Sequence, residues 1–198
     1  MAKRLVVASN NRHKIQEIQA ILGPEWSVLG VADIAPGLTW SETGGSFLEN
    51  ARIKLAALRE HTSESILADD SGLCVDALAG KPGVDSSSFG GVEGDHERNI
   101  DRLLQDLSHV PAEKRGAHFY CLLLYVDETG RESRYEGRCH GKIATSRSGR
   151  GGFGYDPVFI PEKFGITLAD MTETQKNEIS HRGLAMSAFK GAQAKAVR

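Results

Sequence analysis

The order of apolar and polar residues in the first part of the chain predicts a strand followed by a helix. The run from Lys3 to Ala8 is typical of a buried strand. Ile15, Ile18 and Leu22 then recur at helical spacing, and Gly23-Pro24 ends the pattern. The chain therefore opens with a strand, a polar loop and a helix.

The next segments predict two further strands, separated by a loop and a helix. Residues 26–31 have the pattern of a second strand, and residues 36–45 are expected to form a loop bounded by glycines. A Ser-x-x-Glu capping box begins a helix over residues 46–61, whose apolar positions lie on one face. Residues 65–68 are predicted to form a short strand that ends at a pair of aspartates.

A hairpin is the strongest structural signal in the second half of the chain. Residues 118–126 are rich in strand-forming residues, and Asp127-Glu128-Thr129-Gly130 predicts a turn into a second strand over residues 132–143. Residues 80–94 are rich in Gly and Ser and predict a long loop, after which an amphipathic helix begins near Asp95.

The last part of the chain predicts a second glycine-rich loop and more helix. The loop covers residues 146–154, a short strand covers residues 158–160, and helical segments are expected at residues 172–179 and from His181 onward. Parallel strands joined by helices, together with an antiparallel hairpin, predict an α/β fold with a mixed sheet flanked by helices. Ligands of such folds gather at the carboxyl ends of the strands.

Composition favours one domain over residues 1–198, because a 40% hydrophobic chain of this length can fill one substantial core and no linker divides it. The formal net charge of −2 argues against a broad nucleic-acid footprint. No apolar run reaches the roughly 18 residues of a membrane span, and the apolar start is too short for a signal peptide. We therefore expect a cytoplasmic protein that binds neither nucleic acid nor membranes. Cys74, Cys121 and Cys139 lack a Cys-x-x-Cys spacing and indicate ordinary thiols.

The polar loop Ser9-Asn10-Asn11-Arg12-His13-Lys14 is a candidate phosphate cradle. It lies between the first predicted strand and helix, where backbone N–H groups and the positive helix end favour an anion, and Lys14 adds a full charge. The alternative is a helix N-cap followed by a solvated lysine, and the preference of Ser and Asn for N-caps favours it when the loop is taken alone. The glycines and the terminal Gly-Lys of a P-loop are absent.

Asp69 and Asp70 are candidate metal and water ligands. At a strand end, one carboxylate can ligate Mg²⁺ while its neighbour orients a water molecule. An Asx-type turn that caps the strand explains the pair equally well in isolation. The Asp-x-Asp motif of haloacid dehalogenase-like phosphatases is absent, because the two aspartates are adjacent.

The second glycine-rich loop satisfies the G-x-G-x-x-G pattern with Gly149, Gly151 and Gly154. A dinucleotide-binding fold requires a helix to start inside this motif, whereas Pro157 disfavours helical geometry at Asp156. The loop is better interpreted as main chain that approaches a base while Phe153 stacks on it. A flexible loop with one buried phenylalanine is the structural alternative.

The remaining candidates each have a structural explanation as well. Ser180-His181-Arg182 forms either an N-cap with a first helical turn or a set of donors for keto oxygens and phosphate. Lys54 and Lys176 lie in predicted helices, where a solvated lysine is the usual case. Glu42 is of interest only if a second metal ligand is needed near Asp70. No two of the seven histidines have the spacing of a transition-metal site.

Taken in order and at these separations, the motifs resemble those of the inosine triphosphate pyrophosphatase family, which acts on non-standard purine nucleoside triphosphates. The likeness runs from about Leu5 to Ala188. Asn10 departs from the pattern, because many members carry glycine there in a Thr-Gly-Asn-x-x-Lys opening. The most specific segments are Phe47-Leu48-Glu49-Asn50-Ala51, Ala68-Asp69-Asp70-Ser71-Gly72-Leu73, Pro82-Gly83-Val84, Gly151-Gly152-Phe153-Gly154-Tyr155-Asp156-Pro157 and Ile179-Ser180-His181-Arg182-Gly183.

The resemblance implies a two-lobed homodimer, with the active-site cleft between the lobes, that hydrolyses ITP, dITP and XTP to monophosphate and pyrophosphate with Mg²⁺. By position, Asp70 is implied as the general base and as a Mg²⁺ ligand together with Glu42, and Asp69 supports the site. The residues implied to hold the phosphates are Ser9, Asn10, Asn11, Arg12, His13, Lys14, Lys54 and Ser71. Those implied to surround the base are Phe153, Gly154, Tyr155, Asp156, Lys176, His181 and Arg182.

Two other functions stay open from the sequence. One is a pyrophosphatase of the same fold that acts on other modified nucleoside triphosphates, such as modified pyrimidines, which a substrate panel distinguishes. The other is a non-catalytic nucleotide-binding or RNA-binding module, for which the even charge balance is unfavourable and a carboxylate cluster is unnecessary. No motif assigns a residue to the exclusion of guanine or ranks inosine against xanthosine.

Overall fold

A computed structural model describes residues 2–196, which form two compact units. Among the described residues, unit 1 contains residues 2–70, 121–137 and 182–196, and unit 2 contains residues 71–120 and 138–181. The chain thus passes from one unit to the other several times. No helix in the described part of the chain is both long and apolar enough to cross a membrane.

Within residues 2–196, six strands form one mixed sheet in the order β2-β1-β3-β4-β5-β6. β1 pairs in parallel with β2 and β3, whereas β5 and β6 are antiparallel, so the predicted α/β fold with a mixed sheet is confirmed. The strands are β1 (Lys3–Val7), β2 (Trp26–Leu29), β3 (Ile66–Val75), β4 (Gly116–Val126), β5 (Glu132–Ile143) and β6 (Phe159–Pro161).

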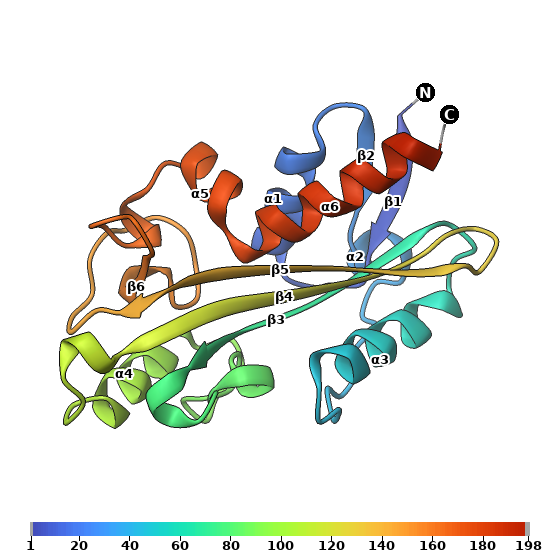
Figure 1. The fold of residues 1–198 in the computed structure, drawn as a ribbon. Helices are drawn as coiled ribbons and strands as arrows, with labels where there is room; N and C mark the ends of the chain where they lie inside the picture. The colour runs from blue at the N-terminus through green and yellow to red at the C-terminus, as the bar shows by residue number, and fades with distance from the viewer. Residues whose placement is uncertain (1, 197–198) are drawn as a thin grey trace. The chain divides into compact units, whose positions relative to one another are not determined.

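The predicted helices are also present (Figure 1). Their first residues are fixed by polar side chains: the Ser46 hydroxyl accepts the N–H of Glu49 at 3.3 Å, and Thr172 forms a reciprocal capping box with Gln175. Gly23 ends the first helix with a positive φ of 81°, which glycine adopts without strain. The helices are α1 (Arg12–Leu22), α2 (Val31–Ile34), α3 (Phe47–Arg59), α4 (His96–Asp106), α5 (Glu173–Ile179) and α6 (His181–Ala196).

The predicted short strand over residues 65–68 is wrong at its end. β3 continues through the aspartates to Val75, because the apolar residues Leu73 and Val75 resume the buried pattern beyond them. Polar residues inside a strand are tolerated where their side chains are paired. Asp69 and Asp70 are buried and ion-paired, so they lie within a long strand and not at its end.

Several smaller details also differ from the predicted elements. Val31 was predicted to end the second strand, but it is the first residue of α2. The Gly30 N–H donates to the Asp33 carboxylate at 2.8 Å, and this contact starts the helical turn. β6 lies one residue later than predicted. The loop over residues 80–94 contains a short 3₁₀ turn at Gly83–Asp85.

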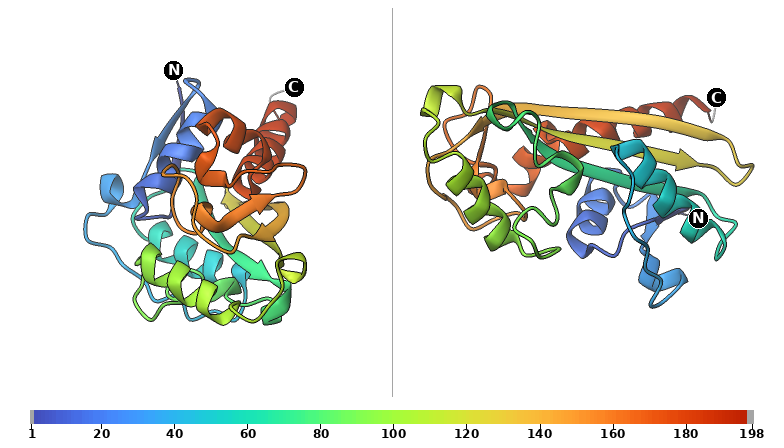
Figure 2. Two further views of the ribbon diagram at one scale, coloured as in Figure 1. Left: turned by 90° about the vertical axis from the view of Figure 1, so that its left-hand side faces the viewer. Right: turned by 90° about the horizontal axis from the view of Figure 1, so that it is seen from below.

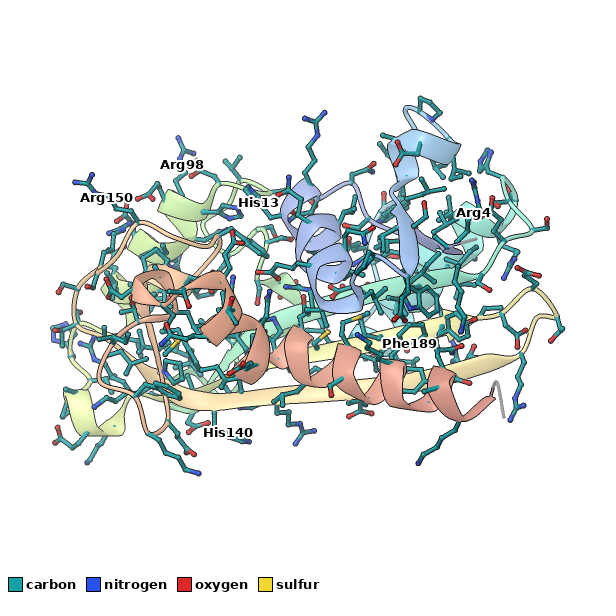
Figure 3. The ribbon with its side chains drawn as sticks, turned by 90° about the horizontal axis from the view of Figure 1, so that it is seen from above. Arg4, His13, Arg98, His140, Arg150 and Phe189 are labelled. Carbon is teal, nitrogen blue, oxygen red and sulfur yellow. The ribbon has the colours of Figure 1, made fainter. Side chains whose placement is uncertain are left out.

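Unit 1 has an apolar core in which α1 and α6 pack on the strands. Phe189 of α6 is fully buried and contacts Trp26, Tyr125 and Tyr135, with ring centroids 5.1 to 5.6 Å apart. Figure 3 shows Phe189 between α6 and the strands. Figure 1 shows α3 on the opposite side of the strands from α6, so this stretch of sheet has two covered faces.

Unit 2 has its own apolar core, in which Ile100 and Leu103 of α4 pack with Leu73 of β3 and Phe159 of β6. Figures 1 and 2 show α4 and α5 on opposite sides of the strands of this unit. The cysteines are free thiols, of which Cys121 and Cys139 are buried and Cys74 is half-buried, as the sequence predicts.

We expect Phe189→Ala to lower the free energy of unfolding by about 3–5 kcal/mol, because the substitution leaves a cavity against three aromatic rings. Urea unfolding followed by circular dichroism measures the change. Leu184→Ala is the matched control on the same helix, because Leu184 is 41% exposed, and it should cost less than about 1 kcal/mol. Equal losses in the two variants would contradict the assignment of Phe189 to the core.

Candidate active site

Asp69 and Asp70 are neighbours in the middle of β3, and the pleat of a strand turns adjacent side chains to opposite faces. The side chain of Asp69 meets Lys14 of α1 and Arg182 of α6. The side chain of Asp70 meets Lys54 of α3. The two aspartates therefore belong to two separate charged clusters of unit 1.

The first cluster consists of Glu42, Lys54 and Asp70. The Lys54 ammonium donates to Asp70 Oδ1 at 2.6 Å and to the Asp69 backbone carbonyl at 3.2 Å, and it lies 3.0 Å from Glu42 Oε2. Trp40 Nε1 donates to the other carboxylate oxygen of Glu42 at 3.3 Å. Lys54 is only 5% exposed, since it lies on the buried face of α3, so the solvated-lysine interpretation is wrong for this residue.

Burial dominates the charge state of Asp70. It raises the pKa of Asp70 to about 6, although the nearby charges of Lys54 and Lys14 act in the opposite direction. The second carboxylate oxygen, Oδ2, is buried and has no hydrogen-bond partner. A buried carboxylate with one unpaired oxygen and a pKa near neutrality is suited to accept a proton or to ligate a cation.

These residues fit a Mg²⁺ ion. The carboxylates of Glu42 and Asp70 converge on one point, since both contact the same ammonium, and Asp70 keeps an unpaired oxygen. No group of three or more His, Cys, Asp or Glu side chains in the described residues is arranged to hold a metal. Mg²⁺ is commonly held by one or two carboxylates together with substrate phosphates, so a two-carboxylate set is sufficient.

The second cluster is centred on Asp69. Lys14 Nζ donates to Asp69 Oδ1 at 2.5 Å, and Arg182 Nε donates to Asp69 Oδ2 at 2.9 Å. Arg182 Nη1 also donates to Glu17 at 2.6 Å, and the Cys121 thiol donates to Asp69 at 3.5 Å. Arg182 is among the largest fully buried side chains, and its contacts come from β3 and α1.

Asp69 and Asp70 differ in charge state for a physical reason. Burial alone would raise the pKa of Asp69, but the adjacent charges of Arg182 and Lys14 hold that pKa well below its usual range. Asp69 is therefore a permanently ionised partner of two cations, whereas Asp70 titrates near neutral pH. Asp69 is thus held by two cations on its face of the strand, and Asp70 remains the candidate for proton transfer.

The polar loop adopts the N-cap arrangement that the sequence offers as the alternative. Asn11 Oδ1 accepts the N–H groups of His13 and Lys14, and the Asn11 N–H donates to the Ser9 hydroxyl at 3.1 Å. The Asn10 side chain donates to the Leu38 carbonyl.

A pocket of about 340 Å³ in unit 1 opens beside this loop. Figure 3 shows His13 at the start of α1, where both Arg12 and His13 are exposed. Phosphate binding by this loop stays a prediction. The pocket is lined by Ser9, Asn10, Arg12, Ile15, Gln16, Gly30, Ala32 and Asp33.

In unit 2 the second glycine-rich loop brings together Phe153, Asp156 and Lys176. The Lys176 ammonium donates to Asp156 Oδ2 at 2.8 Å and lies 4.8 Å from the centre of the Phe153 ring. The same Asp156 oxygen accepts the Phe153 N–H at 2.8 Å. Gly152 has a positive φ of 71°, and a side chain there would collide with Asp156, so glycine is required.

Lys176 is buried, so the solvated-lysine interpretation is wrong here as well. The ring of His96 lies 6.2 Å from that of Phe153. One aromatic ring, one buried cation and a tight main-chain turn therefore lie together on this loop, which is the set of groups that a base-binding loop needs.

The other predicted residues of unit 2 have distinct surroundings. His181 is buried and its ring stacks on Phe119, with centroids 4.7 Å apart and planes 11° from parallel. The Tyr155 hydroxyl donates to the Ser86 carbonyl at 2.9 Å, which makes Tyr155 a support for the loop over residues 80–94. Ser71 is half-buried in β3, and Gly154 adopts a positive φ of 62° in the turn.

Sequence reasoning missed Glu17, Cys121 and His96. Glu17 lies one helical turn after Lys14, which is a local hint that both reach the same place. Its partner Arg182 is 165 residues away, so no local pattern reveals the pair. No sequence pattern pointed to Cys121 or His96 as part of a site. Cys121 lies in a predicted strand, and His96 lies near the start of a predicted helix.

Comparisons with known proteins agree with the sequence motifs. A family model described as the Ham1 family matches residues 5–192. The dITP/XTP pyrophosphatase of Halalkalibacterium halodurans is 40% identical over 181 residues, which cover 91% of this chain and 93% of that protein. The protein of the same name from Streptomyces coelicolor is 43% identical over 190 residues, which cover 94% of both chains.

Solved structures show the same likeness. The Ham1 protein of Staphylococcus aureus is similar with a TM-score of 0.85 at 35% identity, covering 98% of this chain and 100% of its own. A HAM1 protein from Coxiella burnetii has a TM-score of 0.86 at 33% identity and covers 98% of this chain and 99% of its own. Sequence and fold are therefore similar over nearly the whole chain.

We expect Asp69→Asn to lower the free energy of unfolding at pH 7 by about 3–5 kcal/mol, because it leaves the buried Arg182 and the half-buried Lys14 without their shared carboxylate. Urea unfolding measures the loss. Glu64→Gln is the control, because it breaks the exposed Arg4–Glu64 pair and should cost less than about 1 kcal/mol. A loss no larger than that of the control would contradict the central place of Asp69.

The raised pKa of Asp70 predicts a pH dependence of stability. Between the unfolded value near 3.8 and the folded value of about 6, the folded protein binds the proton more tightly than the unfolded chain. The tighter proton binding stabilises the folded protein by up to about 3 kcal/mol. This stabilisation is complete below about pH 4 and is lost as the pH rises through about 6.

Urea unfolding of the wild type and Asp70→Asn in metal-free buffer, from pH 4 to pH 7, measures this contribution. The stability of the variant relative to the wild type should increase with pH. A constant difference would show that Asp70 titrates at its ordinary pKa.

Proposed function

The chain belongs to the Ham1 family, and we propose that it hydrolyses ITP, dITP and XTP to the nucleoside monophosphate and pyrophosphate, which removes these nucleotides from the pool. Relatives about 40% identical over nine-tenths of the chain are named dITP/XTP pyrophosphatases. The observation that carries the proposal is Asp70, a buried carboxylate with an unpaired oxygen that lies beside Lys54 and Glu42.

In this proposal Asp70 is the general base. Its Oδ2, which has no hydrogen-bond partner, accepts a proton from the water that attacks the α-phosphorus. A pKa of about 6 leaves Asp70 ionised at neutral pH yet basic enough to take the proton. Asp69 is not proposed as the general base, because Lys14 and Arg182 neutralise its charge.

Positive groups in unit 1 stabilise the leaving group. Pyrophosphate gains negative charge in the transition state, so fixed positive charge near it lowers the barrier more than it strengthens ground-state binding. Lys54 and Lys14 are the lysines of the two charged clusters. We propose that both bind the triphosphate, together with the N-terminal end of α1.

We propose Mg²⁺ as the cofactor, held by Glu42 and Asp70. When bound, the ion would neutralise phosphate charge that the lysines alone leave uncompensated. The support for this proposal is the convergence of the two carboxylates on one point and the unpaired oxygen of Asp70.

The loop of unit 2 is proposed to bind the base. The Phe153 ring offers a stacking face, and Lys176 and His181 offer donors for keto oxygens. Donors aimed at the purine 6-position satisfy a keto oxygen but oppose the amino group of adenine, and an unmatched buried polar group costs about 1–3 kcal/mol. This difference favours inosine and xanthosine over adenosine nucleotides.

A homodimer in the cytoplasm completes the proposal, on the resemblance to the family. Sedimentation equilibrium of the purified protein tests the dimer. Pyrophosphate release measured across the common and the deaminated triphosphates tests the substrate class. Faster turnover of a modified pyrimidine triphosphate than of dITP would favour the alternative of a pyrophosphatase for other nucleotides.

We expect Asp70→Asn to lower kcat for dITP by about 10²-fold or more while the protein stays folded, because an amide cannot accept the proton. Pyrophosphate release with Mg²⁺ measures turnover, and circular dichroism measures folding. Asp101→Asn makes the same chemical change at an exposed residue that pairs with Arg147, and it should keep the wild-type rate. Near-normal hydrolysis by Asp70→Asn would exclude the assigned role.

A further inference from the structure

Lys54 holds the two carboxylates that fit the metal. Its ammonium contacts Asp70 Oδ1 and Glu42 Oε2 and also donates to the Asp69 carbonyl. An ammonium has three N–H donors, and three protein oxygens lie within 3.2 Å of this one. Lys54 can therefore reach a phosphate only by giving up at least one of these partners.

We propose that Lys54 competes with Mg²⁺ for Glu42 and Asp70, so that the protein binds the metal weakly until a triphosphate draws the ammonium away. The inference rests on the proposed function and adds an order of binding to it. Lys54 thus acts as a positioning residue and not only as a phosphate ligand.

Charge supports this competition. Glu42 and Asp70 together carry two negative charges, and Lys54 already neutralises one of them. A divalent cation bound to the same carboxylates would lie close to the ammonium. Two positive charges that lie close together inside a protein repel each other strongly. Lys54 is buried, so solvent screens the repulsion only weakly.

The triphosphate removes the conflict because it offers the ammonium new acceptors. Lys54 then pairs with phosphate oxygens, and both carboxylates become available to the metal. By linkage, the factor by which the triphosphate tightens metal binding equals the factor by which the metal tightens triphosphate binding. Lys54 is the residue through which this coupling acts.

Lys14 offers a matched control. It is also a lysine of unit 1 and its charge also lowers the pKa of Asp70, but it donates to Asp69 and belongs to the other cluster. Lys14→Met therefore removes the same charge from the neighbourhood and leaves the Lys54 bridge in place. A general electrostatic effect would appear in both variants, whereas the proposed competition appears only when Lys54 is changed.

The experiment measures Mn²⁺ binding to the full-length protein without nucleotide by electron paramagnetic resonance of the free ion. We expect Lys54→Met to bind Mn²⁺ about tenfold more tightly than the wild type, and Lys14→Met to change the dissociation constant by less than about threefold. Trp40 donates to Glu42, so quenching of its fluorescence by Mn²⁺, measured in a Trp26→Phe background because the chain holds a second tryptophan, locates the bound ion at this site. Equal affinity of Lys54→Met and the wild type, or equal gains in both variants, would overturn the inference.

Three additions keep the test decisive. Lys54→Gln, which is neutral and can still donate to Asp70, replaces Lys54→Met if that variant does not fold. In the wild type, the ¹⁵N resonance of the Lys54 ammonium should shift with the same Mg²⁺-dependent midpoint as Mg²⁺ binding, and an unchanged resonance at saturating Mg²⁺ would contradict the competition. Pyrophosphate release from dITP by the wild type is measured in parallel, so that failure of the inference is distinguished from failure of the proposed function.

Discussion

The pleat of β3 is the constraint on which the chemistry of unit 1 depends. Because consecutive residues of a strand point to opposite faces, two adjacent aspartates can be buried without sharing a site. The pKa of each aspartate then depends on the charged side chains on its own face of the strand. Asp69 meets two cations and stays ionised, whereas Asp70 meets one buried lysine and holds its proton up to about pH 6. Two adjacent residues of one strand thus have opposite pKa shifts.

The helices that cover β3 explain why the protein can bury the charges of Asp69 and Asp70. α3 carries Lys54 on its inner face, and α6 carries Arg182 at its beginning, so every buried carboxylate of β3 faces a cation. An unpaired ion at such depth would cost several kcal/mol, which is why the two clusters must form as sets. The contact with Lys54 that makes the burial of Asp70 possible also holds its carboxylate in place.

Local patterns predicted most of the helices and strands. Ile18 and Leu22 marked α1, Ile100 and Leu103 marked α4, and all four are buried as their spacing requires. The pattern failed at β3, where polar residues resembled the end of a strand. They lie inside it because their partners come from distant parts of the chain: Asp69 and Arg182 are separated by 113 residues. Periodicity depends only on residues that are close in sequence, so it could not predict ion pairs between distant parts of the chain.

The same limit applies to the candidate site. The motifs identified Asp70, Lys54, Phe153 and Lys176 as candidates, but they could not distinguish a solvated lysine from a buried one. Burial decided that point, because Lys54 and Lys176 each have a carboxylate partner in the interior. Glu17 escaped notice because an acidic residue on an amphipathic helix is ordinary until its partner is known.

The position of α6 in the sequence has a consequence for biosynthesis. This last helix supplies both Arg182, the partner of Asp69, and Phe189, a centre of the unit 1 core. Chains are made from the amino terminus, so β1, α1 and β3 emerge from the ribosome long before the segment that completes them. Unit 1 therefore reaches its final state only after α6 has emerged, and the nascent chain must carry the charge of Asp69 and an open apolar face until then.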